Sequence, residues 1–346
     1  MKKNIASALK VLFFLGLGIF FIWLFLRNLT PEQKQEIIVS LQHANYWWII
    51  AAMFVGILSH AIRARRWMIL MEPLGYKPRY INVFFAVFIG YFANLALPRL
   101  GEVSRCGVLT RYEKVPFNKS FGTVITERAL DMGVFLLLFL VNLVAQASLL
   151  QYYIEEKVYK PFANKVESAG NKSPVWIYVL AALAVLAVVF YIFRQRFYHL
   201  KFVVKIRDMI LGFLEGMKSL LMIKRPFEFA LHTFLIWFCY FLMTYLVFFS
   251  LPATSGLGLG AGLAVLVFGS IGIILVQGGI GVYPAIVAET LFIYHILNTT
   301  GYAMGWLLWS CQTLLIVIVG SISLFLLHVV NKKNYEPVGD TKQTDI

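Results

Sequence analysis

The sequence predicts an all-α polytopic integral membrane protein with about six full transmembrane helices and two re-entrant helical hairpins. Three observations support this fold class. Hydrophobic residues make up 60% of the 346 residues and charged residues only 14%, whereas soluble domains average about 25% charged residues. The mean hydropathy of the chain is +0.76. Apolar runs of roughly bilayer length recur along the chain, and basic residues gather between them.

The apolar runs place the expected helices. They span 8–26, 46–62, 81–97, 120–146, 175–193, 227–250, 257–276, 282–297 and 302–330. The first run follows Lys2, Lys3 and Lys10, as a signal peptide would, but Arg27 stands where the small-residue cleavage site is expected. We therefore expect the first run to remain as a membrane helix.

The distribution of basic residues predicts the topology. If every run before residue 200 crossed the membrane, the basic segments 98–119 and 194–225 would both be external, against the positive-inside rule. A re-entrant hairpin over about 81–110, turning at 97–101, puts both segments on the cytoplasmic side. The glycine-rich hairpin over about 257–297 is expected to enter from the opposite face, a possible inverted repeat of the kind that transporters use.

The other segments complete a single membrane domain over residues 1–333. We expect a short external amphipathic segment at 30–43, an external loop at 147–174, and a cytoplasmic amphipathic segment at 201–224 that lies on the headgroups. The polar residues 334–346 are expected to be a disordered cytoplasmic tail. Both termini are therefore predicted to be cytoplasmic.

Charged residues at the turn of the first hairpin are the first candidate binding residues. A charge at the centre of a membrane helix costs roughly 2.5 to 3.5 kcal/mol. Arg99 and Arg105 flank the turn, and arginine binds phosphate through two parallel N–H donors. Glu102 is three residues before Arg105, where the two can pair on a helix. The pattern favours a phospholipid headgroup site. The alternative is a cytoplasmic loop in which the arginines touch lipid phosphates non-specifically and Glu102 only neutralises a neighbour.

A second charged group opens the next apolar run. Glu127 and Asp131 share one helical face, and Arg128 lies about 100° around the helix from Glu127. The carboxylates can bind a cation, relay a proton, or hold Arg99 and Arg105 in place. The alternative is an interfacial helix start, where acidic residues suit the positive end of the helix dipole. A span of comfortable length has to include these charges, which favours a functional role.

The glycines of the second hairpin are also candidate site residues. Gly278, Gly279 and Gly281 lie at its turn, where glycine permits tight turning or a close approach of the backbone. Helix packing alone explains them equally well. The basic residues Arg63, Arg65 and Arg66 with Trp67 end the second run, and we interpret them as an interfacial anchor.

Several function classes are not indicated. The three cysteines have no metal-binding spacing, and the sequence has neither a Walker phosphate loop nor a convincing nucleophile motif. We predict no catalytic residues, no metal and no cofactor. The net charge of +14 is explained by cytoplasmic loops near anionic lipids, so we do not expect a nucleic-acid partner.

Four motifs occur in order in this chain: Arg63–Trp67, Asn94–Arg105, Thr126–Asp131 and Gln277–Pro284. Together they resemble the lysylphosphatidylglycerol synthase transmembrane region family, also called flippase-like domain proteins, over about residues 5–330. The resemblance implies translocation of a phospholipid between leaflets. It also implies that Arg99, Glu102, Arg105, Glu127, Arg128 and Asp131 match the polar residues of the family.

Two departures from the family pattern limit what the resemblance implies. About fifteen residues follow the last expected helix, so we expect only the membrane module, without the synthase domain. Tyr283 and Pro284 stand where many relatives have Arg-Glu, and headgroup preference is expected to differ accordingly.

The predicted function is therefore lipid translocation, flippase-like or scramblase-like, of a phospholipid or lipid-linked precursor through a polar intramembrane cavity. The expected partner is a phospholipid with an anionic phosphate, and a homo-oligomer or a separate lipid-synthesis enzyme is a further possible partner. The expected location is the bacterial inner membrane. The alternatives are an ion-coupled transporter of a small solute, an intramembrane lipid-modifying enzyme, and a non-transporting anchor.

Overall fold

The computed structural model describes residues 22–23, 26–27, 29–97, 99–147, 151, 155, 160 and 223–332. Within these residues the chain consists of helices and their connections, and no β-strand occurs there. This confirms the predicted all-α class. Most of the first predicted helix, of the loop 147–174 and of the segment 201–224 lies outside the described residues, as do the run 175–193 and the tail 334–346.

The chain divides into two compact units. The first comprises residues 1–124, 222–292 and 296–346, and the second comprises residues 125–221 and 293–295. The division falls inside one helix, α6, which runs from Phe117 to Ala145.

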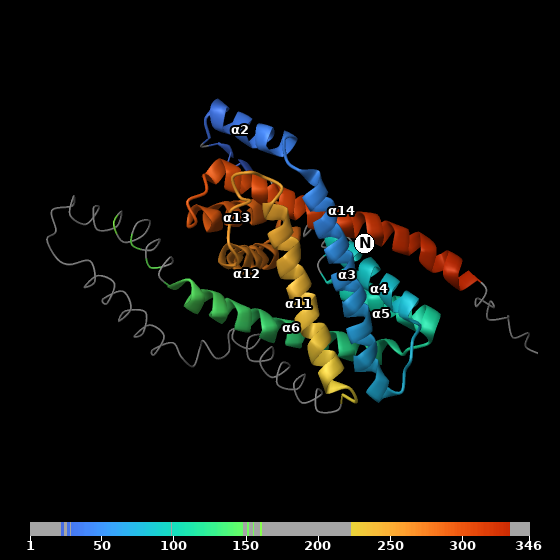
Figure 1. Cartoon of the computed structure of the whole chain (residues 1–346). Helices are drawn as coiled ribbons and strands as arrows, with labels where there is room; N and C mark the ends of the chain where they lie inside the picture. The colour runs from blue at the N-terminus through green and yellow to red at the C-terminus, as the bar shows by residue number, and fades with distance from the viewer. Residues whose placement is uncertain are drawn as a thin grey trace, which may run out of the picture. The chain divides into compact units, whose positions relative to one another are not determined.

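Four helical segments of the described residues are long and apolar enough to cross a membrane. They are Tyr46–Leu74, Phe117–Ala145, Pro226–Phe248 and Asn298–Asn331. The first consists of α3 (Tyr46–Met71) and a short 3-10 turn, η1 (Glu72–Leu74), the second is α6, and the others are α11 and α14. The prediction of a multi-pass membrane protein is therefore confirmed. Both α11 and α14 pack against α3, and Figure 1 shows α3 and α11 side by side.

Shorter helices occupy the two segments that were predicted as hairpins. The first segment contains α4 (Tyr80–Ala96) and α5 (Leu100–Glu113). The second contains α12 (Leu259–Leu275), the 3-10 turn η3 (Gln277–Gly279) and α13 (Val282–Phe292). In both segments the two helices pack against each other. Entry of each hairpin from one side of the membrane stays a prediction.

A glycine contact joins the two helices of the first hairpin. A Cβ atom built on Gly101 of α5 would lie 2.1 Å from the carbonyl oxygen of Gly90 on α4. The Gly101 N–H also donates a 2.7 Å hydrogen bond to the Asn94 Oδ1 atom on α4. This bond satisfies one of the open N–H groups in the first turn of α5. The two helices therefore approach so closely that their backbones touch.

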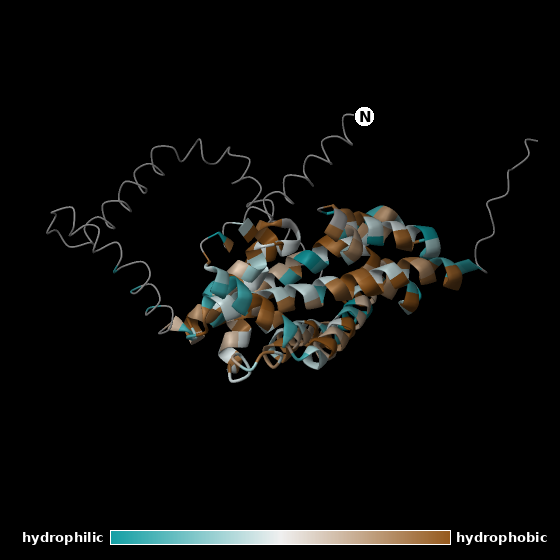
Figure 2. Cartoon of the chain, turned by 90° about the horizontal axis from the view of Figure 1, so that it is seen from above, coloured by the Kyte–Doolittle hydropathy of each residue, from teal (hydrophilic) through white to brown (hydrophobic). Residues whose placement is uncertain are grey.

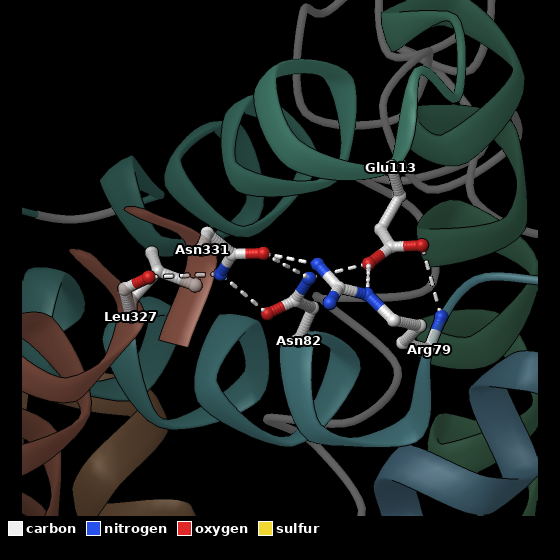
Figure 3. A network of polar contacts seen from close by, with 5 residues as sticks. All are labelled: Arg79, Asn82, Glu113, Leu327 and Asn331. Atoms are coloured by element: carbon white, nitrogen blue, oxygen red, sulfur yellow. Dashed lines mark hydrogen bonds and ion pairs between the residues drawn. The ribbon is translucent and has the colours of Figure 1, made fainter. Parts of the chain in front are cut away.

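A polar clasp joins the base of this hairpin to the end of α14 (Figure 3). Arg79 forms an ion pair with Glu113 at 3.1 Å and donates to the Asn331 amide oxygen. Asn82 and Asn331 exchange hydrogen bonds of 3.0 and 2.8 Å, and Asn82 also donates to Glu113. Asn331 further donates to the Leu327 carbonyl oxygen at 2.8 Å. The bonds satisfy the buried amides of Asn82 and Asn331, whereas the Arg79 side chain is exposed.

The outer faces of the described helices are apolar. Large hydrophobic side chains such as Trp47 and Phe54 of α3 and Phe325 of α14 are among the most exposed. Figure 2 shows hydrophobic residues over much of the helices, with polar positions between them. Such faces suit a bilayer, in which lipid takes the place of water as solvent.

A short external amphipathic segment was expected at residues 30–43, and α2 runs from Pro31 to Gln42. Thr30 caps it: the Thr30 hydroxyl accepts a hydrogen bond from the Gln33 N–H at 3.3 Å, and the Gln33 side chain accepts one from the Thr30 N–H at 3.0 Å. This reciprocal capping box explains why the helix begins here. The helix packs against α14.

Candidate functional site

The turn of the first hairpin presents Arg99 at the surface. Arg99 is exposed and has a φ of 64°, in the left-handed region, which costs a non-glycine residue about 1–2 kcal/mol. It directly precedes α5, whose first turn is held to α4 by the bond between Gly101 and Asn94. The turn therefore displays a guanidinium beside a helix N-terminus, an arrangement that attracts anions.

Arg105 lies inside the protein. Only 3% of its surface is exposed, and its guanidinium carbon is 4.6 Å from the centroid of the Trp67 ring on α3. Trp67 is fully buried, and its indole N–H donates a 2.9 Å hydrogen bond to the hydroxyl of Thr123 at the start of α6. Stacking on a desolvated indole stabilises a guanidinium by roughly 2 kcal/mol. Trp67 and Thr123 therefore position Arg105 between α5 and α3.

Two more arginines are buried on α3 within about one turn of Trp67. Arg63 is 2% exposed and donates a 3.1 Å hydrogen bond to the hydroxyl of Tyr240 on α11. Arg66 is fully buried and donates a 3.1 Å hydrogen bond to the hydroxyl of Thr233, also on α11. We call Arg63, Arg66 and Arg105 the arginine cluster.

The burial of Arg63, Arg66 and Trp67 corrects the interpretation of the Arg63–Trp67 segment as an interfacial anchor. The prediction was wrong for Arg63, Arg66 and Trp67 because α3 continues to Met71 and α11 supplies hydroxyl partners to its arginines. Two sequence signals were available. Arg63 and Arg66 are one turn apart, and Thr233 and Tyr240 are seven residues apart, so each pair shares one face of its helix.

The neighbouring Arg65 is more exposed than Arg63 and Arg66. It is about one-third exposed and forms a 3.1 Å ion pair with Glu228 at the start of α11. Arg225 pairs with the same carboxylate at 3.2 Å and with Glu72 at 3.6 Å. Such exposed pairs contribute about 0–1 kcal/mol each. The motif thus contains buried and exposed arginines at adjacent positions.

The predicted acidic residues occur in both units. Glu102 is half-buried on α5, one turn before Arg105. In the second unit, Glu127 is fully buried on α6, Asp131 is half-buried one turn later, and Arg128 is exposed. A buried carboxylate in an apolar helix is costly, which argues against a simple interfacial helix start. Pairing of these carboxylates with Arg99 and Arg105 stays a prediction.

The glycine turn of the second hairpin adopts conformations that require glycine. Gly278, Gly279 and Gly281 have φ values of 70°, 68° and 73°, which other residues adopt only with strain. The Trp309 indole N–H of α14 donates a 2.6 Å hydrogen bond to the Gly278 carbonyl oxygen. This turn, η3, also packs against α4. The second hairpin therefore touches the first, although residues 114–258 separate them in the sequence.

Three arginines are buried in this region. In the part of the chain that the structure describes, no group of three or more His, Cys, Asp or Glu side chains could hold a metal ion. Guanidinium groups over an indole and beside hydroxyls instead suit an oxyanion. Binding of a phosphate by these arginines stays a prediction.

Comparison with known proteins agrees with this membrane architecture. The family model of the lysylphosphatidylglycerol synthase TM region matches residues 7–320. A UPF0104 membrane protein of Methanocaldococcus jannaschii is 35% identical over 104 residues, which is 29% of this chain and 31% of that protein. The glycosyltransferase AglD of Haloferax volcanii is 28% identical over 98 residues, 28% of this chain and 16% of that protein. The similarity thus spans less than a third of either relative. No solved structure shows significant similarity to the chain.

Proposed function

Because the chain belongs to the lysylphosphatidylglycerol synthase transmembrane region family, we propose that it acts on membrane lipids, by moving a phosphate-bearing lipid between leaflets. The single observation that supports this most strongly is the burial of Arg63, Arg66 and Arg105 within an apolar helical protein. Buried charges in membrane proteins are costly and are retained mainly where they bind or transport.

The barrier to lipid exchange is the transfer of a charged headgroup into the apolar bilayer interior. Removing an ionised group from water without partners costs several kcal/mol or more. A cluster of guanidiniums can replace the water around the phosphate while the acyl chains stay in the bilayer. In this proposal, the exposed Arg99 meets the headgroup first and the arginine cluster then holds its phosphate.

The remaining predicted residues have supporting roles in the proposal. Glu102 sets the local charge beside Arg105, and the turn of Gly278, Gly279 and Gly281 lets the backbone approach the headgroup closely. Glu127, Arg128 and Asp131 form a separate polar group on α6 that contacts the substrate or a cationic headgroup. Such movement without an energy source is scrambling, and coupling to an ion would make it directional. An anionic phospholipid is the proposed partner.

The experiment that tests this proposal compares two adjacent arginines. The full chain is reconstituted in liposomes with headgroup-labelled phosphatidylglycerol or phosphatidylcholine, and leaflet exchange is followed by quenching of the outer label. Arg66→Gln removes a buried donor, whereas Arg65→Gln removes one that forms an exposed ion pair. Arg105→Gln tests the other helix, and thermal unfolding verifies the folding of every variant.

Exchange is expected in the wild type and in Arg65→Gln. It should fall about tenfold or more in Arg66→Gln and Arg105→Gln, because a hydrogen bond to a charged group is worth about 1.5–3 kcal/mol. Arg105→Lys should recover part of the rate, since it keeps the charge and loses the planar fork. Wild-type exchange no faster than that of protein-free liposomes would refute translocation. Accumulation of a soluble solute, or formation of a modified lipid by the purified chain, would instead support a transporter or an enzyme.

A further inference from the structure

A buried indole on α11 lacks a hydrogen-bond acceptor. Trp237 lies in the middle of α11, a helix that is long enough to span a membrane. Its side chain is half-buried, and its Nε1 atom is buried without a hydrogen-bond partner among the described residues. An indole N–H can only donate, and native proteins nearly always satisfy a buried donor because an unmet one is destabilising. This N–H is therefore a candidate for contact with a ligand.

Two other tryptophans show how indole N–H groups are satisfied inside this protein. Trp67 of α3 donates a 2.9 Å hydrogen bond to the Thr123 hydroxyl. Trp309 of α14 donates a 2.6 Å hydrogen bond to the Gly278 carbonyl oxygen. Buried tryptophans usually find such a partner. Trp237 therefore departs from the pattern that the other two follow.

The face of α11 that carries Trp237 is the face that meets the arginine cluster. Thr233 precedes Trp237 by four residues and Tyr240 follows it by three, and residues at these spacings are neighbours on one helix face. The Thr233 hydroxyl accepts from Arg66 and the Tyr240 hydroxyl accepts from Arg63, each at 3.1 Å. The Trp237 ring also packs edge-on against the Tyr240 ring, with centroids 5.9 Å apart. Along the helix, the indole therefore lies between the two residues that bind arginines.

Contacts between α3 and α11 enclose this region. Besides the two hydrogen bonds, rings of α11 lie over the guanidiniums: the Tyr240 centroid is 5.9 Å from the Arg63 guanidinium carbon, and the Phe229 centroid is 5.6 Å from that of Arg66. A phosphate binds a guanidinium through two parallel hydrogen bonds and opposes its charge, which a neutral hydroxyl does not do. An anion that enters between the helices can therefore replace the hydroxyls as a partner of the arginines and open the interface at Trp237.

A phosphodiester matches the donors on the two facing helices. The guanidiniums supply positive charge, whereas the indole N–H is a neutral donor whose direction is set by the packing of Trp237 against Tyr240. Each non-bridging oxygen of a phosphodiester has several lone pairs, so one anion accepts hydrogen bonds from arginine and from the indole at once. A cation accepts no hydrogen bond, so the N–H of Trp237 favours an anion on this face of α11.

We propose that Trp237 is a binding residue for the lipid phosphate, and that its indole N–H donates a hydrogen bond to a non-bridging oxygen of the phosphodiester held by the arginine cluster. The bond forms as the anion enters between α3 and α11, because the N–H is otherwise enclosed. The arginines supply the charge, and the indole fixes the orientation of the headgroup. This assignment rests on the proposed function, because it assumes that Arg63 and Arg66 receive a phosphate.

The test observes the indole N–H groups directly. The full chain, with its eight tryptophans isotopically labelled at nitrogen, is titrated with dihexanoyl phosphatidylglycerol in a maltoside detergent that contains no phosphate. Each indole gives one signal in a proton–nitrogen correlation spectrum, and a new hydrogen bond moves the proton signal downfield. The signal that Trp237→Phe lacks belongs to Trp237. Glycerophosphoglycerol, the same headgroup without acyl chains, is titrated in parallel, so that lipid binding is distinguished from binding of a soluble phosphodiester.

In the wild type, the Trp237 signal should move downfield as the lipid binds, whereas that of the exposed Trp47 at the start of α3 should stay. Trp237→Phe keeps a ring against Tyr240 and loses the donor, so calorimetry should show binding about tenfold or more weaker, as expected for a hydrogen bond to a charged group. The matched control Trp47→Phe should bind as the wild type does. If Trp237→Phe does not fold, replacing the other tryptophans one at a time assigns the signal by elimination, and the wild-type spectrum decides the question.

The possible failures are distinguishable. Lipid binding that leaves the Trp237 signal in place, or equal affinities of Trp237→Phe and wild type, would overturn the indole contact and leave translocation intact. A downfield shift of Trp237 without leaflet exchange would overturn translocation and leave the indole contact intact. A shift with glycerophosphoglycerol but not with the lipid would overturn the lipid as the ligand. An absence of binding by either compound would overturn the arginine cluster as a phosphate site, and the indole contact with it.

Discussion

The contact between Gly101 and Gly90 makes a specific prediction about the first hairpin. In Gly101→Ala the new Cβ atom would lie 2.1 Å from the Gly90 carbonyl oxygen and 2.6 Å from the Asn94 side-chain carbon. Ordinary van der Waals contact begins at 3.4 Å, so the two helices must separate by about 1.3 Å at this point. Because the nearest atom belongs to the backbone, no side-chain rotation can relieve the clash.

The expected loss of stability in Gly101→Ala follows from the packing of the two helices. Overpacking of a filled interior costs about 1–3 kcal/mol, and we expect the upper end because the hydrogen bond from Gly101 to Asn94 is strained as well. Gly107→Ala is the matched control on the same helix. Its Cβ atom would meet nothing within 4 Å, so it should stabilise α5 by up to about 1 kcal/mol through helix propensity alone.

The assay uses a cysteine in the same interface. Cys106 of α5 is fully buried, so its labelling by a thiol reagent reports separation of the hairpin from its neighbours. Gly101→Ala should label faster than wild type and unfold at a lower temperature, whereas Gly107→Ala should do neither. Site-resolved mass spectrometry distinguishes Cys106 from Cys239 and Cys311, which are also buried. Equal labelling and equal unfolding temperatures for the two variants would refute the close approach.

Three further predictions concern single hydrogen-bonded groups. Thr123→Val leaves the buried indole N–H of Trp67 without its acceptor and should cost about 1–3 kcal/mol, which a double-mutant cycle with Trp67→Phe would measure. Asn331→Ala removes a buried member of the polar clasp and should lower the unfolding temperature by a similar free energy; an unchanged value would show that the clasp is dispensable. Thr30→Ala should cost about 1 kcal/mol in capping, measured as faster hydrogen exchange in α2. The Thr30 side chain also lowers the pKa of the Glu32 carboxyl below its ordinary value. This contribution is present above the ordinary carboxyl pKa and is lost as the pH falls through the lowered pKa, so α2 protection that is independent of pH would contradict it.

Much of the helical framework was predictable from the sequence. The apolar runs at 46–62, 227–250 and 302–330 correspond to α3, α11 and α14, and the two interrupted segments fold as packed helix pairs. Hydrophobic runs predict helices well in membrane proteins because backbone groups must be satisfied within each segment. The end of α3 was not predicted, since the charged residues from 63 onward were taken as the start of the interface.

The candidate site was predicted in part. Arg105 was singled out from its cost in a membrane, and the structure buries it. Arg63 and Arg66 were assigned to the interface, because the hydroxyls that receive their hydrogen bonds lie about 170 residues away on α11. The positions of Arg99 and of the three glycines at their turns agree with the sequence pattern, whereas their contact with a ligand stays a prediction.

From the amino-acid sequence it was possible to predict that this protein folds in a bilayer, where most of the described helices lie, and that Arg105 is a costly charge. These are local properties, since hydropathy and helix length depend on neighbouring residues. The packing of distant helices sets which arginines are buried, that η3 contacts α4, and that Arg63 and Arg66 bond to hydroxyls of α11. Such partners depend on how distant helices pack, and in a membrane that packing rests on close small-residue contacts and interhelical hydrogen bonds, which leave little periodic signal in the sequence.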